Sequence, residues 1–176
     1  REYPNPRPKP NFVLTDTEGR PFPFRDSTEG SMTLLFFGYT NCPDVCPVHM
    51  ANIAAALHKL PDHVARQVKV VFVTTDPERD TPLVIRAWLD HFDKRFIGLT
   101  GTQAEVDSAQ VAMRLPPAYR EEIPGAPYQV GHSAHVIAFT KDGKKTVVPM
   151  NVQVTPSTAR TPTERRPSCL ATNMAP

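Results

Sequence analysis

The chain has 176 residues, of which 40% are hydrophobic, and its formal net charge is +2. This length and apolar content suit one domain with a buried core, and the scattered basic residues give no reason to expect a nucleic-acid partner. No run of about 18 apolar residues is present, so we expect no membrane-spanning segment, and no signal peptide is visible.

The N-terminal part of the chain combines a proline-rich lead with a short hairpin. Residues 1–10 are rich in proline and are expected to form an extended spacer. Because the chain starts at Arg1 rather than at Met, a signal or membrane anchor that once preceded this spacer fits the sequence. Residues 11–14 and 21–24 are expected to form two strands joined by a turn.

A buried strand and a helix enclose the two cysteines on which the interpretation depends. Residues 33–37 are an apolar run without alternation, which indicates a strand buried on both faces. Cys42 and Cys46 follow, and the prolines beside them place the start of a helix close to one of the two cysteines. The buried stripe of that helix is expected to consist of Met50, Ile53, Leu57 and Leu60.

Strands and helices then alternate. Residues 68–74 form a second buried strand, and residues 95–99 a shorter one. Thr81 and Pro82 begin the helix between these strands, and a capping box at 102–105 begins the next helix. The apolar faces of the two helices are expected to contain Ile85, Trp88, Leu89 and Phe92 in the first, and Val106, Ala109 and Met113 in the second.

The last third of the chain is read as a loop, a hairpin and a tail. Residues 115–131 look like a long proline-rich loop, which is unusual in a compact domain and suggests a function. Residues 134–139 form a buried strand that turns back into 145–148. The tail, 149–176, has no apolar periodicity and is expected to be atypical and poorly ordered; Cys169, within it, has no expected role.

This order of elements predicts an α/β domain over residues 11–148. Strands that alternate with helices form a sheet with parallel pairs, and such sheets place their sites at the carboxyl ends of the strands. A cysteine pair after the first central strand indicates a thioredoxin-like fold. This fold would carry an N-terminal β-hairpin and a long loop before the strand that follows His132.

The cysteine pair itself allows two kinds of chemistry. Cysteines four positions apart on a helix lie on one face, and a helix N-terminus favours thiolate over thiol. Two close thiolates suit a soft metal ion or thiol–disulfide exchange. A purely structural role as two small buried side chains is disfavoured by the flanking prolines.

Three motifs occur in one order and together resemble one family. They are Cys42-Pro-Asp-Val-Cys46-Pro47 after Phe-Phe-Gly-Tyr-Thr, the run from Thr75 to Pro82, and His132-Ser-Ala. Over about residues 10–148 the chain resembles the Sco/SenC copper chaperones. The resemblance implies a thioredoxin-like domain that holds copper through Cys42, Cys46 and His132. Cu(I) is the expected ion, with Cu(II) as an alternative.

The resemblance also implies a biological setting. Members of this family deliver copper to the dinuclear copper site of cytochrome c oxidase, or reduce the cysteines of that site. The expected partners are the copper-site subunit of the oxidase and other periplasmic copper chaperones or thiol reductants. The expected location is the bacterial periplasm or the outer face of the cytoplasmic membrane, in preference to the mitochondrial intermembrane space. The expected membrane association is through a removed N-terminal anchor only.

Several residues near these motifs have competing interpretations. His49, three positions after Cys46, could share its helix face and compete with His132 as a ligand. His135 is expected to point away from His132 and to be a packing or surface residue. Asp44 is best read as an acid at a helix N-terminus. The family usually has Asp before the metal histidine, where this chain has Gly131.

Asp76, Arg79 and Asp80 follow the second buried strand, close to the cysteine turn in a thioredoxin-like sheet. They could support the site or dock a partner, although a network of caps and ion pairs explains them equally well. The alternative function is a thiol–disulfide oxidoreductase or peroxidase that uses Cys42 and Cys46 without metal. The Trp-Cys-x-x-Cys and Thr-x-x-Cys patterns of such enzymes are absent, so an enzymatic role is not favoured.

Overall fold

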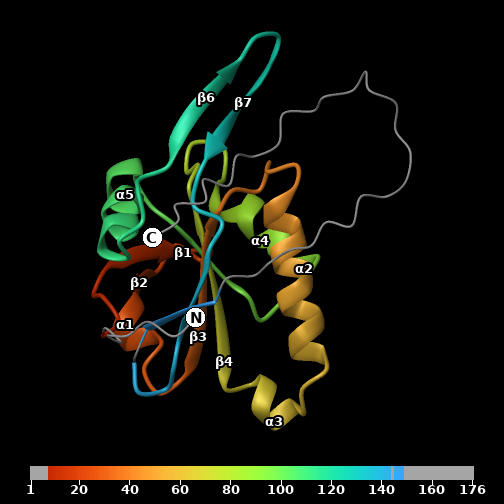
Figure 1. Ribbon diagram of the computed structural model, residues 1–176, viewed down its shortest axis with the longest axis vertical. Helices are drawn as coiled ribbons and strands as arrows, with labels where there is room; N and C mark the ends of the chain where they lie inside the picture. Colours follow the sequence, from red (N-terminus) through yellow and green to blue (C-terminus); the bar gives the residue numbers. More distant parts are fainter. Residues whose placement is uncertain (1–7, 144, 149–176) are drawn as a thin grey trace.

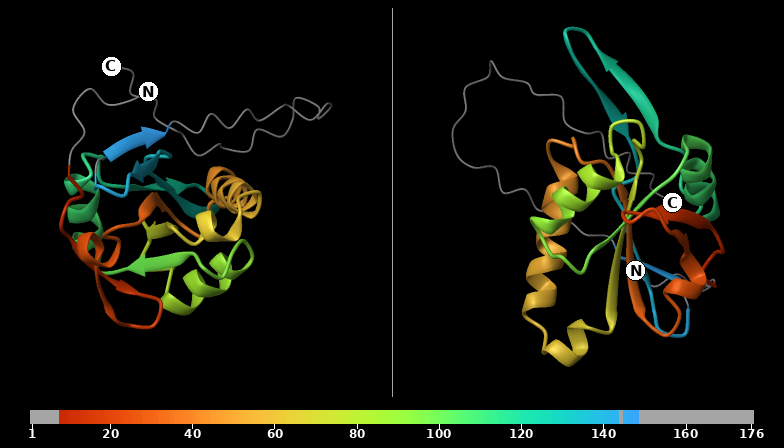
Figure 2. Two further views of the ribbon diagram at one scale, coloured as in Figure 1. Left: turned by 90° about the horizontal axis from the view of Figure 1, so that it is seen from below. Right: turned by 180° about the vertical axis from the view of Figure 1, so that it is seen from behind.

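The computed structural model describes residues 8–143 and 145–148. Among these residues, seven strands form one mixed sheet in the order β2-β1-β5-β4-β3-β8-β9, with helices on both faces (Figures 1 and 2). The predicted thioredoxin-like α/β fold is confirmed. The predicted tail at 149–176, with Cys169, and most of the predicted spacer lie outside the described residues.

The centre of the sheet consists of parallel strands, as the apolar runs predict. β3 (Met32–Gly38) pairs in parallel with β4 (Val68–Thr74), and β4 pairs in parallel with β5 (Ile97–Thr100). On the other side of β3, β8 (Val136–Phe139) runs antiparallel and is followed by β9 (Lys145–Val148). The N-terminal hairpin of β1 (Val13–Asp16) and β2 (Pro21–Pro23) joins the far edge through β5.

Helices divide the core into two clusters. α2 (Val45–His58) and α4 (Pro82–Asp90) cover one face, where Phe36, Met50 and Ile85 are fully buried. α5 (Gln103–Ala112) lies on the opposite face, with its predicted capping box formed by Thr102 and Glu105. The short helices α1 (Phe24–Ser27) and α3 (Asp62–Ala65) were not predicted, since each has only four residues and no period to detect.

Three predictions of detail are wrong. α2 begins at Val45, so Cys46 lies in its first turn but Cys42 precedes the helix, and the two cysteines do not share a helix face. α2 ends at His58, so Leu60 lies beyond it and is 40% exposed rather than part of the buried stripe. The expected long loop before β8 contains a hairpin.

This hairpin, β6 (Tyr119–Ile123) and β7 (Ala126–Gly131), projects beyond the end of the sheet (Figure 1). Its prolines look like loop residues in the sequence, yet a two-stranded ribbon has free edges where proline is tolerated. Gly125 turns the ribbon with a φ of +76°, a conformation that favours glycine. The hairpin leads directly into His132, so it belongs to the framework of the site.

The core also holds the start of the described chain. Lys9 is 3% exposed, and its ammonium group donates hydrogen bonds to the carbonyl oxygen of Thr28 and the hydroxyl of Thr33. Burial lowers the pKa of Lys9, and the neighbouring charge of Lys69 lowers it further. The segment before β1 is therefore attached to the domain at Lys9.

No helix among the described residues has the length and apolar character needed to cross a membrane.

Candidate metal centre

The cysteine turn begins where β3 ends. Gly38 closes the strand, and the amide of Cys42 donates to the carbonyl of Tyr39 at 3.2 Å, which folds the chain back toward α2. Gly38 has a steric role here, because a Cβ added to it would lie 2.9 Å from the Cys46 sulfur and 2.7 Å from a ring carbon of Phe36. The missing side chain gives the Cys46 sulfur its space.

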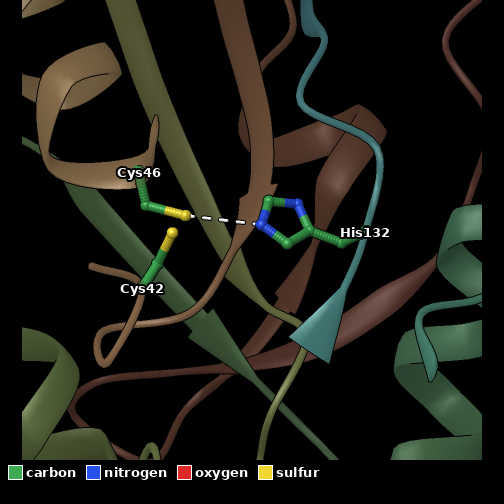
Figure 3. Close-up of side chains that lie close together, drawn as sticks. All are labelled: Cys42, Cys46 and His132. Atoms are coloured by element: carbon green, nitrogen blue, oxygen red, sulfur yellow. Dashed lines mark hydrogen bonds between the residues drawn. The ribbon is translucent and has the colours of Figure 1, made fainter. Parts of the chain in front are cut away.

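The structure brings together the three residues that the sequence singled out. The sulfurs of Cys42 and Cys46 and a ring nitrogen of His132 all lie within 4.8 Å of one another. Figure 3 shows the two sulfurs side by side, with the imidazole reaching them from the segment after β7. The site is shielded, since Cys42 is 5%, Cys46 0% and His132 9% exposed. Both cysteines are thiols rather than a disulfide.

The His132 ring is oriented so that one nitrogen is available to the sulfurs. Its Nδ1 donates to the carbonyl oxygen of Ser133 at 3.1 Å, and its Nε2 lies 3.4 Å from the Cys46 sulfur. Tyr39 and Phe36 hold the ring edge-on, with centroid distances of 5.7 and 6.1 Å. A histidine whose second ring nitrogen is fixed by a carbonyl presents a lone pair in the manner of a metal ligand.

A buried carboxylate holds the cysteine turn against the sheet. Asp80 is fully buried and accepts hydrogen bonds from the Thr40 amide at 3.0 Å, the Thr40 hydroxyl at 2.5 Å and the Thr74 hydroxyl at 2.6 Å. Burial raises the pKa of Asp80, although these hydrogen bonds oppose the shift. Asp80 therefore joins the end of β4 and the start of α4 to the residues just before Cys42.

A second polar group ties the hairpin to the same end of the sheet. Asp76 forms an ion pair with Arg79 and accepts a hydrogen bond from the Tyr128 hydroxyl at 2.9 Å. The Arg79 guanidinium lies over the Tyr128 ring at 3.6 Å from its centroid and over the Tyr39 ring at 5.8 Å. Burial and the neighbouring Asp76 raise the pKa of Tyr128, so this hydroxyl keeps its proton and remains a donor. The Asp76–Arg79–Tyr128 group thus connects the hairpin with Tyr39, which packs on His132.

The other candidates lie around the cluster and do not join it. His49 is 2% exposed, and its ring packs 5.1 Å from that of Phe36. Burial lowers the pKa of His49, and the nearby His132 and His135 add to this effect. His135 is half-buried and exchanges a hydrogen bond with the Ser133 hydroxyl at 2.7 Å. Asp44 is the N-cap residue of α2, as expected for an acid at a helix N-terminus.

Sequence reasoning missed three of the residues that support the cluster. Gly38, Tyr39 and Tyr128 carry no metal-ligand chemistry, and no spacing in the sequence links Tyr128 to Asp76. Sequence reasoning did name Asp76, Arg79 and Asp80, which follow the second buried strand, as possible supports of the site or as a network of caps and ion pairs. Thr81 caps α4, as predicted, by accepting from the Val84 amide, whereas Asp80 accepts from the buried Thr74 hydroxyl.

Comparison with known proteins identifies relatives along most of the chain. A family model described as SCO1/SenC matches residues 2–161. A protein of Stutzerimonas stutzeri whose name refers to copper binding is 34% identical over 140 residues, which cover 80% of this chain and 68% of that protein. Mitochondrial protein SCO1 of Saccharomyces cerevisiae is 32% identical over 148 residues, which cover 82% of this chain and 49% of that protein. The chain thus spans only about half of the yeast relative.

A solved structure supports the same relationship. ScoI of Bradyrhizobium japonicum, determined with copper bound, is 34% identical in sequence and superimposes with a TM-score of 0.72. The match covers 80% of this chain and 87% of that one. The shared fold and the level of identity place the two proteins in one structural family.

We predict that Gly38→Ala weakens Cu(I) binding by about ten-fold, because the added methyl displaces the Cys46 sulfur. Competition with a chromophoric Cu(I) chelator measures the affinity. Gly98→Ala is the control, since a Cβ there would crowd Ile85 most closely, and also Thr17 at 2.9 Å and Leu89 at 3.0 Å, with no cysteine or histidine among these nearest atoms. Equal losses of affinity in the two variants would show that Gly38 has no specific effect on the sulfur.

We also predict that the stability advantage of the wild type over Asp80→Asn shrinks as the pH rises above about 4. The folded-state pKa of Asp80 is raised, so its titration contributes stability at low pH that is lost as the pH rises through that pKa. Urea unfolding between pH 3.5 and 7 measures this trend. Asp93→Asn should show the opposite trend, because a hydrogen bond from Arg95 lowers the pKa of Asp93. Parallel trends in the two variants would contradict the account of Asp80.

Proposed function

This chain belongs to the SCO1/SenC family, and on that premise we propose that it is a copper-binding metallochaperone that serves the dinuclear copper site of cytochrome c oxidase. The observation that carries the proposal is the shielded cluster of Cys42, Cys46 and His132, whose donor atoms lie within 4.8 Å of one another. The copper-bound structure of the B. japonicum relative supports copper as the ion.

The donor set favours Cu(I) over harder ions. Two thiolates and one imidazole are soft or borderline donors, which select Cu(I) over ions such as magnesium and calcium. The shielding of the sulfurs also protects a reduced ion and the thiols that would hold it from solvent. Within this proposal Cys42 and Cys46 supply the thiolates, and His132 supplies its Nε2.

The chain's own residues prepare this set before copper arrives. Asp80 holds the turn that carries Cys42, and the first turn of α2 holds Cys46. The Ser133 carbonyl accepts a hydrogen bond from the Nδ1–H of His132, which leaves the Nε2 lone pair directed toward the sulfurs. Binding copper therefore requires the loss of the thiol protons and little rearrangement of the backbone.

We propose an extracytoplasmic location, in the bacterial periplasm or on the outer face of the cytoplasmic membrane. The support is family membership together with the bacterial relatives from S. stutzeri and B. japonicum. The proposed partner is the oxidase subunit that carries the dinuclear copper site, and the cargo passes between thiolates of the two proteins.

A second candidate is reduction of the oxidase cysteines by the same pair. The two sulfurs lie within 4.8 Å of each other, close enough for a dithiol to become a disulfide after modest movement. In that reaction Cys42 and Cys46 lose two electrons and two protons and form one disulfide. The partner disulfide takes up both electrons and both protons and becomes two thiols.

We predict that the reduced protein binds about one Cu(I), and that Cys42→Ala, Cys46→Ala and His132→Ala each weaken binding by more than about 100-fold, beyond the usual effect of outer-sphere changes. Chelator competition under anaerobic conditions measures both the stoichiometry and the affinity. His91→Ala, at an exposed histidine after α4, should bind copper like the wild type. Unchanged affinity in His132→Ala would remove this residue from the ligand set.

A dithiol assay on the metal-free protein distinguishes the carrier function from the reductase function. A carrier should reduce a model disulfide much more slowly than thioredoxin does under the same conditions. Turnover at a thioredoxin-like rate, abolished in Cys42→Ala, would favour the reductase.

A further inference from the structure

Gly131, the last residue of β7, lies beneath the ring of Tyr119. The two residues face each other across the hairpin as a cross-strand pair. A Cβ added to Gly131 would lie 2.6 Å from Cε1 and 2.7 Å from the hydroxyl oxygen of Tyr119, and closer still to Cζ. The ring therefore occupies the space that a side chain at position 131 would need.

The reason for a glycine at this position is steric. Among the described residues, the glycines with a positive φ are Gly19, Gly30, Gly125 and Gly143. Gly131 is not one of them, so other residues could adopt its backbone conformation. Gly131 is buried, whereas Tyr119 is 53% exposed, so the ring shields the glycine with one part and faces outward with another. An aromatic ring laid over a glycine on the neighbouring strand restricts a backbone that is otherwise loosely held.

The position in the chain gives this contact its importance. Gly131 separates Val130, which is buried in the core cluster that includes both cysteines, from His132. The backbone at Gly131 thus sets the path by which His132 leaves the hairpin and reaches the sulfurs. Tyr128 ties the same strand to Asp76, so the base of the hairpin is held at two points.

We propose that Tyr119 is a positioning residue of the metal centre, which acts by packing on Gly131 and so fixes the backbone that presents His132. This inference rests on the proposed copper-binding function. It makes the projecting hairpin part of the copper site, although no atom of Tyr119 is among the donors. It also means that a side chain at position 131 weakens the site where it displaces the ring.

Copper affinity in a set of full-chain variants tests the proposal. Tyr119→Ala should weaken Cu(I) binding by about ten-fold, and Tyr119→Phe, which keeps the ring, should stay within about two-fold of the wild type. Gly131→Ala should also cost about ten-fold. In the Tyr119→Ala background Gly131→Ala should cost little more, because the ring that it would displace is gone.

A second background distinguishes positioning from a general effect on folding. In His132→Ala, Tyr119→Ala should cause no further loss of affinity, since the residue on which it acts is absent. An equal loss of affinity in the presence and absence of His132 would overturn the proposal. So would a Tyr119→Ala variant with the affinity of the wild type.

A metal-free measurement keeps this test separate from the proposed function. The NMR signals of the His132 ring in the reduced apoprotein should broaden or shift in Tyr119→Ala and remain as in the wild type in Tyr119→Phe. If the wild type bound no copper, the proposed function would fail, and these signals would still decide the role of Tyr119. Unaltered His132 signals in Tyr119→Ala would overturn that role.

Discussion

The pairing of β3 with β8 is the constraint on which the site depends. The two strands run antiparallel with Phe36 opposite Val136, so the residues after Phe36 and the residues before Val136 emerge at one end of the sheet. Cys46 and His132 are 86 positions apart in the sequence, and that register brings the Cys46 sulfur to 3.4 Å from Nε2 of His132. A slip of one residue would turn alternate side chains to the opposite face and separate the donors from their packing.

Around this register, two buried acids organise the end of the sheet. Asp80 bonds to the backbone and hydroxyl of Thr40, before the cysteine turn, while Asp76 bonds to Tyr128 on the hairpin. Asp80 therefore holds the turn that carries Cys42, and Asp76 holds the hairpin that leads into His132. Both acids follow β4, which lies beside β3. The run that includes the two acids thus supports the site from the neighbouring strand, without supplying a donor.

Much of this arrangement could be predicted from the sequence, because its signals are local. The run of apolar residues at 68–74 gave the bounds of β4, and Thr81-Pro82 gave the start of α4, since caps and buried strands depend on near neighbours. The three candidate donors, which the structure brings together, were singled out through motif resemblance. The hairpin at Tyr119–Gly131 was not predicted, because its prolines suit a free-edged ribbon as well as a loop. The contacts of Tyr119 and Tyr128 depend on tertiary packing, which no spacing in the sequence encodes.

The identity of the donor atoms decides whether this site binds copper as proposed. X-ray absorption at the copper edge, on the full chain loaded with one equivalent of Cu(I), counts these donors directly. The geometry of Cys42, Cys46 and His132 predicts two sulfur donors and one imidazole nitrogen, with the nitrogen lost in His132→Ala. A spectrum with sulfur donors alone, or one that His132→Ala leaves unchanged, would contradict the account.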